Sequence, residues 1–259
     1  MTDALTTSGR ALVRTPIAPM YAEPDVASAQ LSQRVAGHEV ELLEARDDWF
    51  LARGSDRYEG WIHRGFLIPP PPATARGSAQ MVRVSLGCVT RTASGDGRAL
   101  PLGARLAPGE QVKSGETVSL MELPARFPRT ANAITRSACT LFEGAPYLWG
   151  GITPWGADCS GFVQTIYGLH GVELPRDAWQ QSEQGRDAGG LEDLDPADLA
   201  FFTDRPDKRV SHVAIALGDK RLVHLALGRG GYATEKLNDG RDPYVAVLRG
   251  RFLRSRRVL

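Results

Sequence analysis

Cysteine is scarce in this chain of 259 residues, which contains three: Cys88, Cys139 and Cys159. Three cysteines cannot all pair with one another, and their spacing matches no metal site. We therefore expect a protein of a reducing compartment that uses neither a metal ion nor a cofactor. Because there are so few cysteines, the position of each one is informative.

An excess of one charge and a long apolar run are missing as well. Lys and Arg total 31 against 30 for Asp and Glu, which leaves a net charge of +1. This balance gives no electrostatic reason to expect nucleic acid or an anionic membrane as a partner. No stretch approaches the roughly eighteen apolar residues of a spanning helix, and the N-terminus lacks the pattern of a secretory signal. We expect a cytoplasmic protein.

Short apolar stretches broken by turn residues fill the first part of the chain. Apolar and polar residues alternate there, as in Val40 with Leu42 and Trp49 with Leu51, and short strands without a helical period are typical of a small β-barrel. The proline run in "IPPPPATARGSAQ" indicates a stiff connector, and a second stretch of short strands follows it. Helical spacing begins near residue 130. The sequence therefore predicts a first β-barrel, a Pro-rich linker, a second β module and an α+β domain, over residues 1–70, 71–80, 81–125 and 126–259.

Two of the cysteines have ordinary structural surroundings. Cys88 lies in the apolar alternation of the second β module, which predicts a core position. Cys139 lies in a helix that Thr130 is expected to cap and Gly144 to stop, and we interpret it as a bystander. These two positions leave Cys159 as the candidate for chemistry.

Cys159 stands in "WGADCSGF", directly before an apolar stripe at helical spacing. The residues of this stripe are Phe162, Val163, Ile166 and Tyr167. Cys159 is therefore predicted at a helix N-terminus, where unpaired amides and the macrodipole lower a thiol pKa and also stabilise an oxyanion. Asp158 opposes ionisation of the thiol, so we assign it to binding a cationic group of the substrate.

A cysteine nucleophile needs a base and an orienting group. Among five histidines, His212 and His224 fall in "VSHVAIALGDKRLVHLAL", which predicts a hairpin closed by the three residues "GDK". That register puts His212 opposite Ala226 and His224 opposite Ala214, so the two rings share a face at about 7–8 Å between Cα atoms. The small alanines leave room for the helix that carries the thiol. We predict His212 as the base and His224 as its orienter; a metal site is the alternative, although no fourth ligand has a recognisable spacing.

Five ordered blocks in this region resemble the NlpC/p60 family of cell-wall cysteine peptidases. They are "PYLWGGITPWGADCSGF", "LPRDAWQQ", "DLAFF", "SHVAIALGD" and "RLVHLA", and the likeness extends over residues 130–248. The resemblance implies a papain-like α+β catalytic domain with a triad of Cys159, His212 and His224. It also implies that Tyr147 positions or polarises the scissile carbonyl.

The front of the chain, through "APMYAEPD" and "YEGWIHRGFL", resembles bacterial SH3 domains. Such domains precede the catalytic domain in γ-D-glutamyl-L-diamino acid endopeptidases, so the whole fold is predicted as α+β, with two small SH3-like barrels before the peptidase. The resemblance implies a murein tripeptide or tetrapeptide with a free N-terminal L-Ala as substrate. It assigns Glu23, Tyr58, Asp158 and Ser160 to the free amine of the substrate, and we also predict Trp149 and Arg176 as substrate-binding residues.

Several of these assignments have alternatives. Ordinary surface and strand packing also explains Glu23 and Tyr58, and Arg176 is suited either to a substrate carboxylate or to bracing Asp158. Ala178 stands where members of the family often have serine, which leaves part of the D-Glu pocket open.

Three functions follow from these observations. The first is a cytoplasmic peptidase that cleaves the bond between γ-D-Glu and the diamino acid in peptides recycled from the cell wall. The second is an exported wall hydrolase that uses its SH3 modules as wall anchors. The third is a wall-peptide-binding protein with a disused site.

Overall fold

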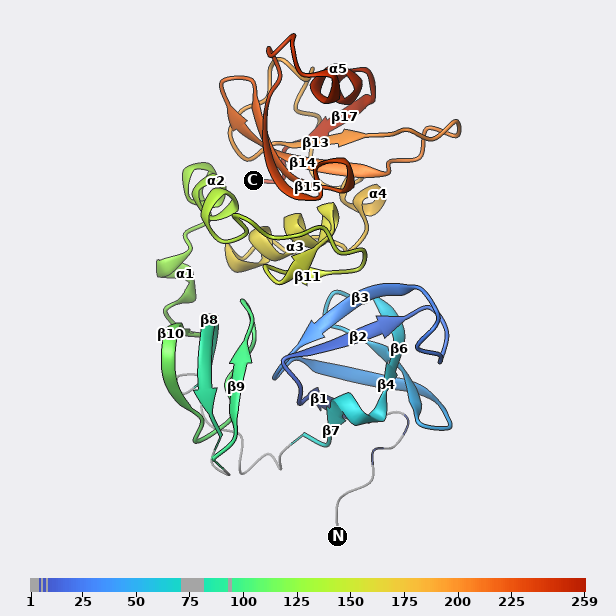
Figure 1. Ribbon diagram of the computed structural model, residues 1–259, viewed down its shortest axis with the longest axis vertical. Coiled ribbons are helices and arrows are strands. Elements are labelled where there is room, and N and C mark those ends of the chain that lie inside the picture. The colour runs from blue at the N-terminus through green and yellow to red at the C-terminus, as the bar shows by residue number, and fades with distance from the viewer. Residues whose placement is uncertain (1–4, 6, 8, 71–81, 93–94) are drawn as a thin grey trace. The chain divides into compact units, whose positions relative to one another are not determined.

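A computed structural model describes residues 5, 7, 9–70, 82–92 and 95–259. The chain divides into two compact units, Met1–Arg126 and Phe127–Leu259, and each is described by itself (Figure 1). The predicted linker, residues 71–80, lies outside the described residues. Among the described residues, no helix is long and apolar enough to cross a membrane.

The N-terminal unit begins with an antiparallel sheet in the order β3-β2-β6-β5-β4-β1-β7. In β1, β2 and β5 every second residue is buried, as the sequence pattern predicts, and the strands build one apolar core around Met20, Leu42 and Ile62. A 3-10 turn, η1 (Arg64–Phe66), leads into the last strand. The strands are β1 (Arg10–Val13), β2 (Ile17–Tyr21), β3 (Gln30–Val35), β4 (Glu39–Arg46), β5 (Trp49–Arg53), β6 (Glu59–His63) and β7 (Leu67–Ile68).

A smaller sheet in the order β10-β8-β9 completes this unit, and the short helix α1 (Leu123–Arg126) follows it. Its strands are β8 (Arg83–Arg91), β9 (Gly97–Leu100) and β10 (Gln111–Ser119). Backbone and side-chain hydrogen bonds join it to the first sheet: Nε2 of His38 donates to the carbonyl of Gly103 at 3.2 Å, and Arg98 donates to that of Arg14 at 2.7 Å. Cys88 is buried in β8, as predicted.

The predicted β-rich region ahead of an α+β domain is confirmed, but the closure of its sheets into barrels is not. In the part of the chain that the structure describes, β3 and β7 are the two edges of the first sheet, and no pairing joins them. The two closed SH3-like barrels therefore stay a prediction.

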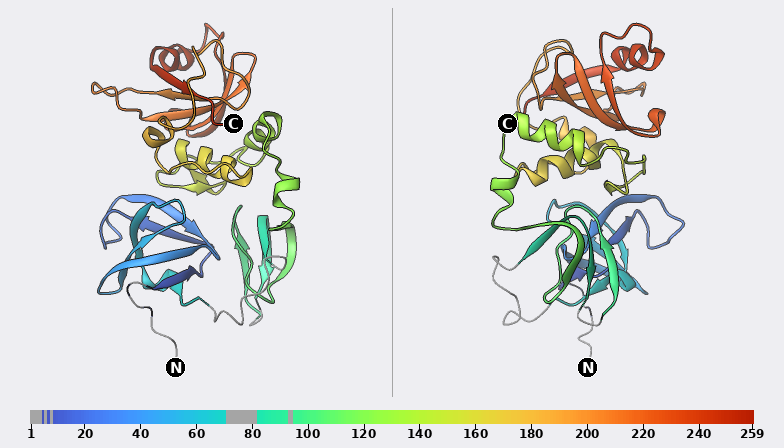
Figure 2. Two further views of the ribbon diagram at one scale, coloured as in Figure 1. Left: turned by 180° about the vertical axis from the view of Figure 1, so that it is seen from behind. Right: turned by 60° about the vertical axis from the view of Figure 1, so that its left-hand side comes forward.

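The C-terminal unit is built on an antiparallel sheet in the order β16-β15-β14-β13-β17, and its α+β class is confirmed. Helices α2 and α3 lie together on one side of this sheet and contact β14 (Figures 1 and 2). The helices are α2 (Ala131–Thr140), α3 (Cys159–Leu169), α4 (Ala178–Gln181) and α5 (Pro243–Gly250), with the 3-10 turn η4 (Leu227–Arg229). The strands are β13 (Leu199–Phe202), β14 (His212–Gly218), β15 (Arg221–Ala226), β16 (Gly231–Lys236) and β17 (Phe252–Arg256), and a small ladder pairs β11 (Ile152–Thr153) with β12 (Gly156–Ala157).

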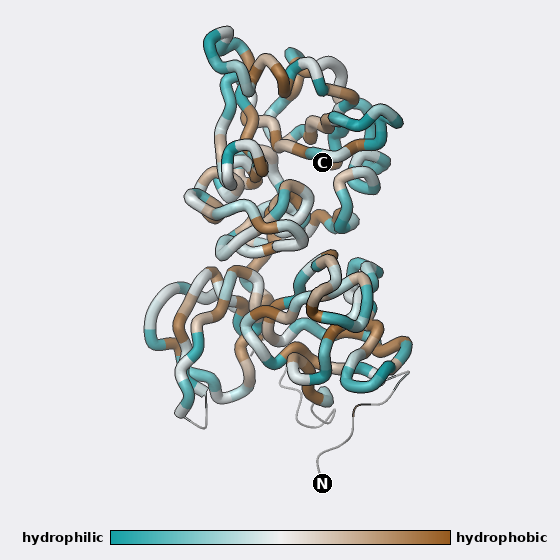
Figure 3. Tube along the Cα trace, turned by 45° about the vertical axis from the view of Figure 1, so that its right-hand side comes forward, coloured by the Kyte–Doolittle hydropathy of each residue, from teal (hydrophilic) through white to brown (hydrophobic). Residues whose placement is uncertain are grey.

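Local sequence signals explain where these helices begin. The side chain of Thr130 accepts the N–H of Ala133 and caps α2, as predicted. Pro243 occupies the first turn of α5, where its missing N–H costs no hydrogen bond. Apolar segments, brown in Figure 3, alternate with hydrophilic segments, teal, in both units. The predicted stop at Gly144 is three residues late, because α2 gives way to a cap at Leu141.

Candidate active site

Helix α3 starts at Cys159, and the residue before it is its N-cap. One carboxylate oxygen of Asp158, Oδ1, accepts the N–H of Gly161 at 2.7 Å, and the other, Oδ2, accepts the N–H of Gly150 at 2.8 Å. The acid therefore satisfies a free amide of the helix and also ties the glycine-rich loop to it. The predicted position of the thiol at a helix N-terminus is confirmed.

Arg176 lies against Asp158 and resolves the two alternatives left by the sequence. Its guanidinium donates to Oδ2 at 2.6 Å and to Oδ1 at 3.0 Å, and its side chain is 1% exposed. It also donates at 2.9 Å to Ser160 Oγ, which itself donates to Asp158 at 3.2 Å. Arg176 thus braces Asp158. Protein donors already occupy both oxygens of this carboxylate. The assignment of Asp158 and Ser160 to the substrate amine stays a prediction.

The glycine of "DCSG" is required by a close approach of the backbone. A Cβ at Gly161 would lie 2.1 Å from the carbonyl oxygen of Gly151, which accepts the N–H of Asp158 at 3.2 Å. In the same helix, a Cβ at Gly168 would meet nothing within 4 Å.

We expect Gly161→Ala to lower the free energy of unfolding by about 1–3 kcal/mol, because the added methyl group pushes the loop away from the helix. Gly168→Ala is the matched control, and it should raise the free energy of unfolding by about 0.5–1 kcal/mol through helix propensity. Urea denaturation of both variants measures the difference. Equal effects at the two positions would contradict the packing argument.

The hairpin of β14 and β15 has the predicted register but not the predicted turn. Asp219 and Lys220 both have positive φ, at 50° and 57°, which indicates a two-residue type I′ turn. A bulge at Leu217 places one extra residue in β14, so that the two-residue turn and the bulge together span as many residues as the predicted three-residue loop. The three-residue loop was therefore wrong, whereas the pairing of Ile215 with Val223 agrees with the predicted register.

The two imidazoles meet as predicted. Nε2 of His212 lies 2.8 Å from Nδ1 of His224, with ring centroids 4.9 Å apart. The backbone N–H of Val213, next to His212, donates to the sulfur of Cys159. The two imidazoles are thus in contact, and the thiol lies by the backbone of the residue that follows the first of them, while the catalytic roles of all three stay predictions.

One predicted packing arrangement is wrong. The alanine face of the hairpin does not receive the cysteine helix: Ala214 and Ala216 pack in one cluster with Leu248 of α5. Side chains alternate along a strand, so Val213 and Ile215 lie on the other face, and β14 contacts α2 and α3. The sequence showed room on the alanine face but not which helix would occupy it.

A family model matches this unit. Residues 144–245 match the NlpC/P60 family. The C-terminal unit belongs to the NlpC/P60 family. The match confirms the predicted membership in this family of cysteine peptidases, and it includes the thiol and both imidazoles.

Relatives of this NlpC/P60 domain are named as dipeptidyl-peptidases. A γ-D-glutamyl-L-lysine dipeptidyl-peptidase of Bacillus cereus is 38% identical over 118 residues, which are 42% of this chain and 35% of that protein. The match thus spans about a third of that relative's length. Dipeptidyl-peptidase 6 of Lysinibacillus sphaericus is 24% identical over 84% of this chain and 88% of its own.

A solved structure matches nearly the whole chain. It is the crystal structure of an NlpC/P60 family protein from Bacillus cereus, which covers 97% of this chain and 100% of its own, with a TM-score of 0.79 and 20% identity. At this identity the likeness concerns the fold: an NlpC/P60 domain after a β-rich region.

The environment of the thiol in this NlpC/P60 domain corrects one prediction. Burial raises the pKa of Cys159 to about 12, and the Asp158 carboxylate adds to this rise; the N–H groups of Val213 and Ser160 and the charge of Arg176 oppose it but are outweighed. Burial and the neighbouring His224 hold the pKa of His212 well below its ordinary value. The thiol pKa in the free protein is therefore raised, not lowered as the helix position predicted.

We expect iodoacetamide to alkylate Cys159 slowly at pH 6, with a rate that rises about tenfold per pH unit up to pH 9, because the thiolate fraction grows in that proportion below the pKa. Mass spectrometry of the modified peptide measures the rate, and the same cysteine in urea-unfolded protein is the control. A rate that is already at its plateau below pH 7 would show that the thiol is ionised.

A further carboxylate behind the histidines was missed by the sequence reasoning. Glu235 of β16 lies 3.2 Å from Nε2 of His224, and Arg229 holds it with two hydrogen bonds of 2.8 Å each. The signal is the register, which pairs His224 with Ala233 and so makes Glu235 its diagonal neighbour. It was available only once β16 was recognised as the next strand of the sheet.

The other predicted residues belong to both units. Tyr147 is half-buried, and burial, followed by the charges of Cys159 and Asp158, raises its pKa, so the phenol lies near both groups. Trp149 is 65% exposed in the glycine-rich loop. Glu23 is exposed after β2, and Tyr58 is half-buried before β6; both belong to the N-terminal unit. Their substrate roles stay predictions.

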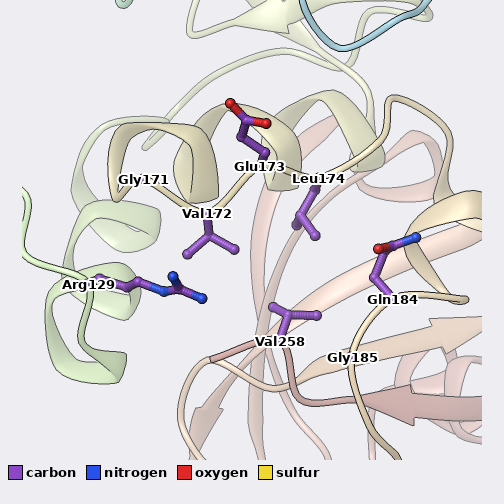
Figure 4. Close-up of a pocket in the computed structure, with 8 residues that line it drawn as sticks. All are labelled: Arg129, Gly171, Val172, Glu173, Leu174, Gln184, Gly185 and Val258. Atoms are coloured by element: carbon purple, nitrogen blue, oxygen red, sulfur yellow. The ribbon is translucent and has the colours of Figure 1, made fainter.

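A cavity of about 190 Å³ lies elsewhere in the C-terminal unit (Figure 4). It is lined by Arg129, Glu173, Gln184 and neighbours, and it includes none of the predicted catalytic residues. Among the described residues, no cluster of three or more His, Cys, Asp or Glu is arranged to hold a metal ion.

Proposed function

We propose that the protein is a cysteine peptidase that cleaves the bond between γ-D-Glu and the diamino acid of murein peptides. The observation that carries this proposal is the contact of 2.8 Å between His212 and His224, next to a thiol at a helix N-terminus in an NlpC/P60 domain. The name of one relative supports the choice of bond, since it is a γ-D-glutamyl-L-lysine dipeptidyl-peptidase.

The chemistry begins with two neutral groups. His212 takes the thiol proton as the sulfur of Cys159 attacks the γ-carbonyl carbon of D-Glu, and free amides at the start of α3 stabilise the oxyanion. His212 then gives this proton to the leaving amine of the diamino acid, and a thioester remains on the sulfur. Water hydrolyses the thioester with His212 again as base, which releases L-Ala-D-Glu and restores the thiol.

We further propose that the N-terminal unit contains SH3-like barrels and that the substrate is a tripeptide or tetrapeptide with a free N-terminal L-Ala. The likeness to γ-D-glutamyl-L-diamino acid endopeptidases supports both points, and it assigns Glu23 and Tyr58 to the free amine. We place the reaction in the cytoplasm, in the recycling of wall peptides. A purified protein that pellets with sacculi would instead support an exported wall hydrolase.

Product analysis tests the function. Incubation with L-Ala-γ-D-Glu-meso-diaminopimelate should release L-Ala-D-Glu and the free diamino acid in equal amounts, measured by liquid chromatography with mass spectrometry. An N-acetylated form of the same peptide is the control for amine recognition, and equal rates on both would overturn that part. No cleavage of either peptide would overturn the proposed bond, and the lysine analogue measures the preference at the third position.

A further inference from the structure

The second histidine of the site contacts a buried carboxylate that is itself paired with an arginine. His224 is 0% exposed and Glu235 is 3% exposed, and the carboxylate accepts from Arg229 through both of its oxygens. Arg229 also pairs with Asp242, the N-cap of α5, and lies over the ring of Tyr244 at 4.2 Å. Arg229 of η4 therefore holds the carboxylate, and Arg229 is itself held by the N-cap and the first turn of α5.

The charge of Glu235 determines the direction of its hydrogen bond with His224. Burial raises the pKa of this carboxyl, but hydrogen bonds from His224 and Arg229 more than offset the rise and leave the pKa below its ordinary value. An ionised carboxylate only accepts hydrogen bonds. Nε2 of His224, at 3.2 Å, must therefore carry a hydrogen and donate it.

This donation determines which other ring nitrogens of His212 and His224 carry a hydrogen. In its neutral form His224 carries its one N–H on Nε2, so in that form its Nδ1 is an acceptor. Its partner at 2.8 Å, Nε2 of His212, must then be the donor. The lone pair of His212 is then left on Nδ1, the ring nitrogen that does not face His224, and the backbone of the adjacent Val213 lies by the thiol.

We propose that Glu235 is a positioning residue that selects the tautomer of both imidazoles and so leaves Nδ1 of His212 free to take the thiol proton. This inference rests on the proposed function, because it assigns the base of that reaction. Glu235 touches neither the thiol nor the substrate, and it acts only through His224.

Nuclear magnetic resonance of protein labelled with ¹⁵N-histidine tests the tautomers without any substrate. Ring nitrogen shifts distinguish protonated from unprotonated nitrogens, and we expect a hydrogen on Nε2 and none on Nδ1 in both His212 and His224. A hydrogen on Nδ1 of His224 in the unaltered protein would overturn the proposal. The readout does not depend on turnover, so it separates a failure of this inference from a failure of the proposed function.

The kinetic test compares Glu235→Gln with Glu235→Ala. In Glu235→Gln, we expect the amide oxygen at the position of Oε2, where it accepts from Arg229, and the amide nitrogen at the position of Oε1, where it donates to His224 and reverses both tautomers. We expect kcat to fall at least about 100-fold with KM within threefold, by analogy with the wrong-tautomer effect in serine proteases. Glu235→Ala imposes no tautomer and should lose less, and Glu235→Asp, which keeps the carboxylate, should recover most of the activity.

The order of these variants separates the proposal from a purely structural role. If the residue served only packing, the isosteric Gln would be milder than Ala, and that order would overturn the proposal. Asp198→Asn is the matched control, since Asp198 is another buried carboxylate paired with an arginine, Arg257, away from the site. Its kcat should stay within about threefold of the unaltered protein. Thermal denaturation of each variant shows that the comparison is made on folded protein.

Discussion

Cys159→Ala should abolish cleavage of L-Ala-γ-D-Glu-meso-diaminopimelate, with kcat reduced by at least about 10⁴-fold. The sulfur is the atom that bonds to the substrate carbonyl, and loss of a nucleophile of this kind removes most of the catalysis that a triad supplies. The methyl group of alanine leaves the N-cap by Asp158 and the braces on it intact, since these contacts use the backbone of α3 and neighbouring side chains. Steady-state kinetics on the purified variant measures the loss.

The other two cysteines provide controls of the same chemistry. Cys88 is buried in β8 and Cys139 is partly buried in α2. Alanine at either position should keep kcat within about threefold, with any loss confined to stability. Activity that survives in Cys159→Ala, or that disappears in Cys139→Ala without unfolding, would move the nucleophile away from Cys159.

Arg176→Met should cause the largest loss of stability in this region, about 3–5 kcal/mol in the free energy of unfolding. Removal of one partner of a buried ion pair leaves the other charge without compensation, and Asp158 remains buried when Arg176 is lost. The same substitution removes a hydrogen bond to Ser160, beside the nucleophile. Chemical denaturation in urea measures the change.

Two further variants make this prediction specific. Arg254 pairs with Glu183 at the surface, where both side chains are exposed, so Arg254→Met should cost less than about 1 kcal/mol. Combining Arg176→Met with Asp158→Asn should restore part of the lost stability, because the asparagine is neutral and still caps α3. A double variant that is less stable than Arg176→Met would show that the uncompensated charge is not the cause.

The sequence predicted those parts of the site that local patterns determine. The start of α3 follows from an apolar stripe that begins directly after Cys159, and the meeting of His212 with His224 follows from the period of two along paired strands. The turn was wrong and the register right, because a two-residue turn with a bulge at Leu217 advances the chain as far as a three-residue loop does.

The parts that failed depend on contacts between distant segments. The pKa of Cys159 is set by burial and by Asp158, and no helix pattern reports how deeply a residue is buried. Arg176 and Glu235 come from segments that reach the site only after the chain has folded. In the N-terminal unit, alternation predicted the strands, but closure of a barrel depends on pairing between its edges, which residue spacing does not specify.

A rapid acid quench during turnover measures the proposed chemistry most directly. The unaltered protein is mixed with L-Ala-γ-D-Glu-meso-diaminopimelate, quenched within one turnover, digested and analysed by mass spectrometry. We predict that the peptide containing Cys159 gains the mass of an L-Ala-D-Glu acyl group, and that this adduct decays as free dipeptide is released. Release of the dipeptide while the sulfur of Cys159 carries no acyl group at any quench time would contradict covalent catalysis at this residue.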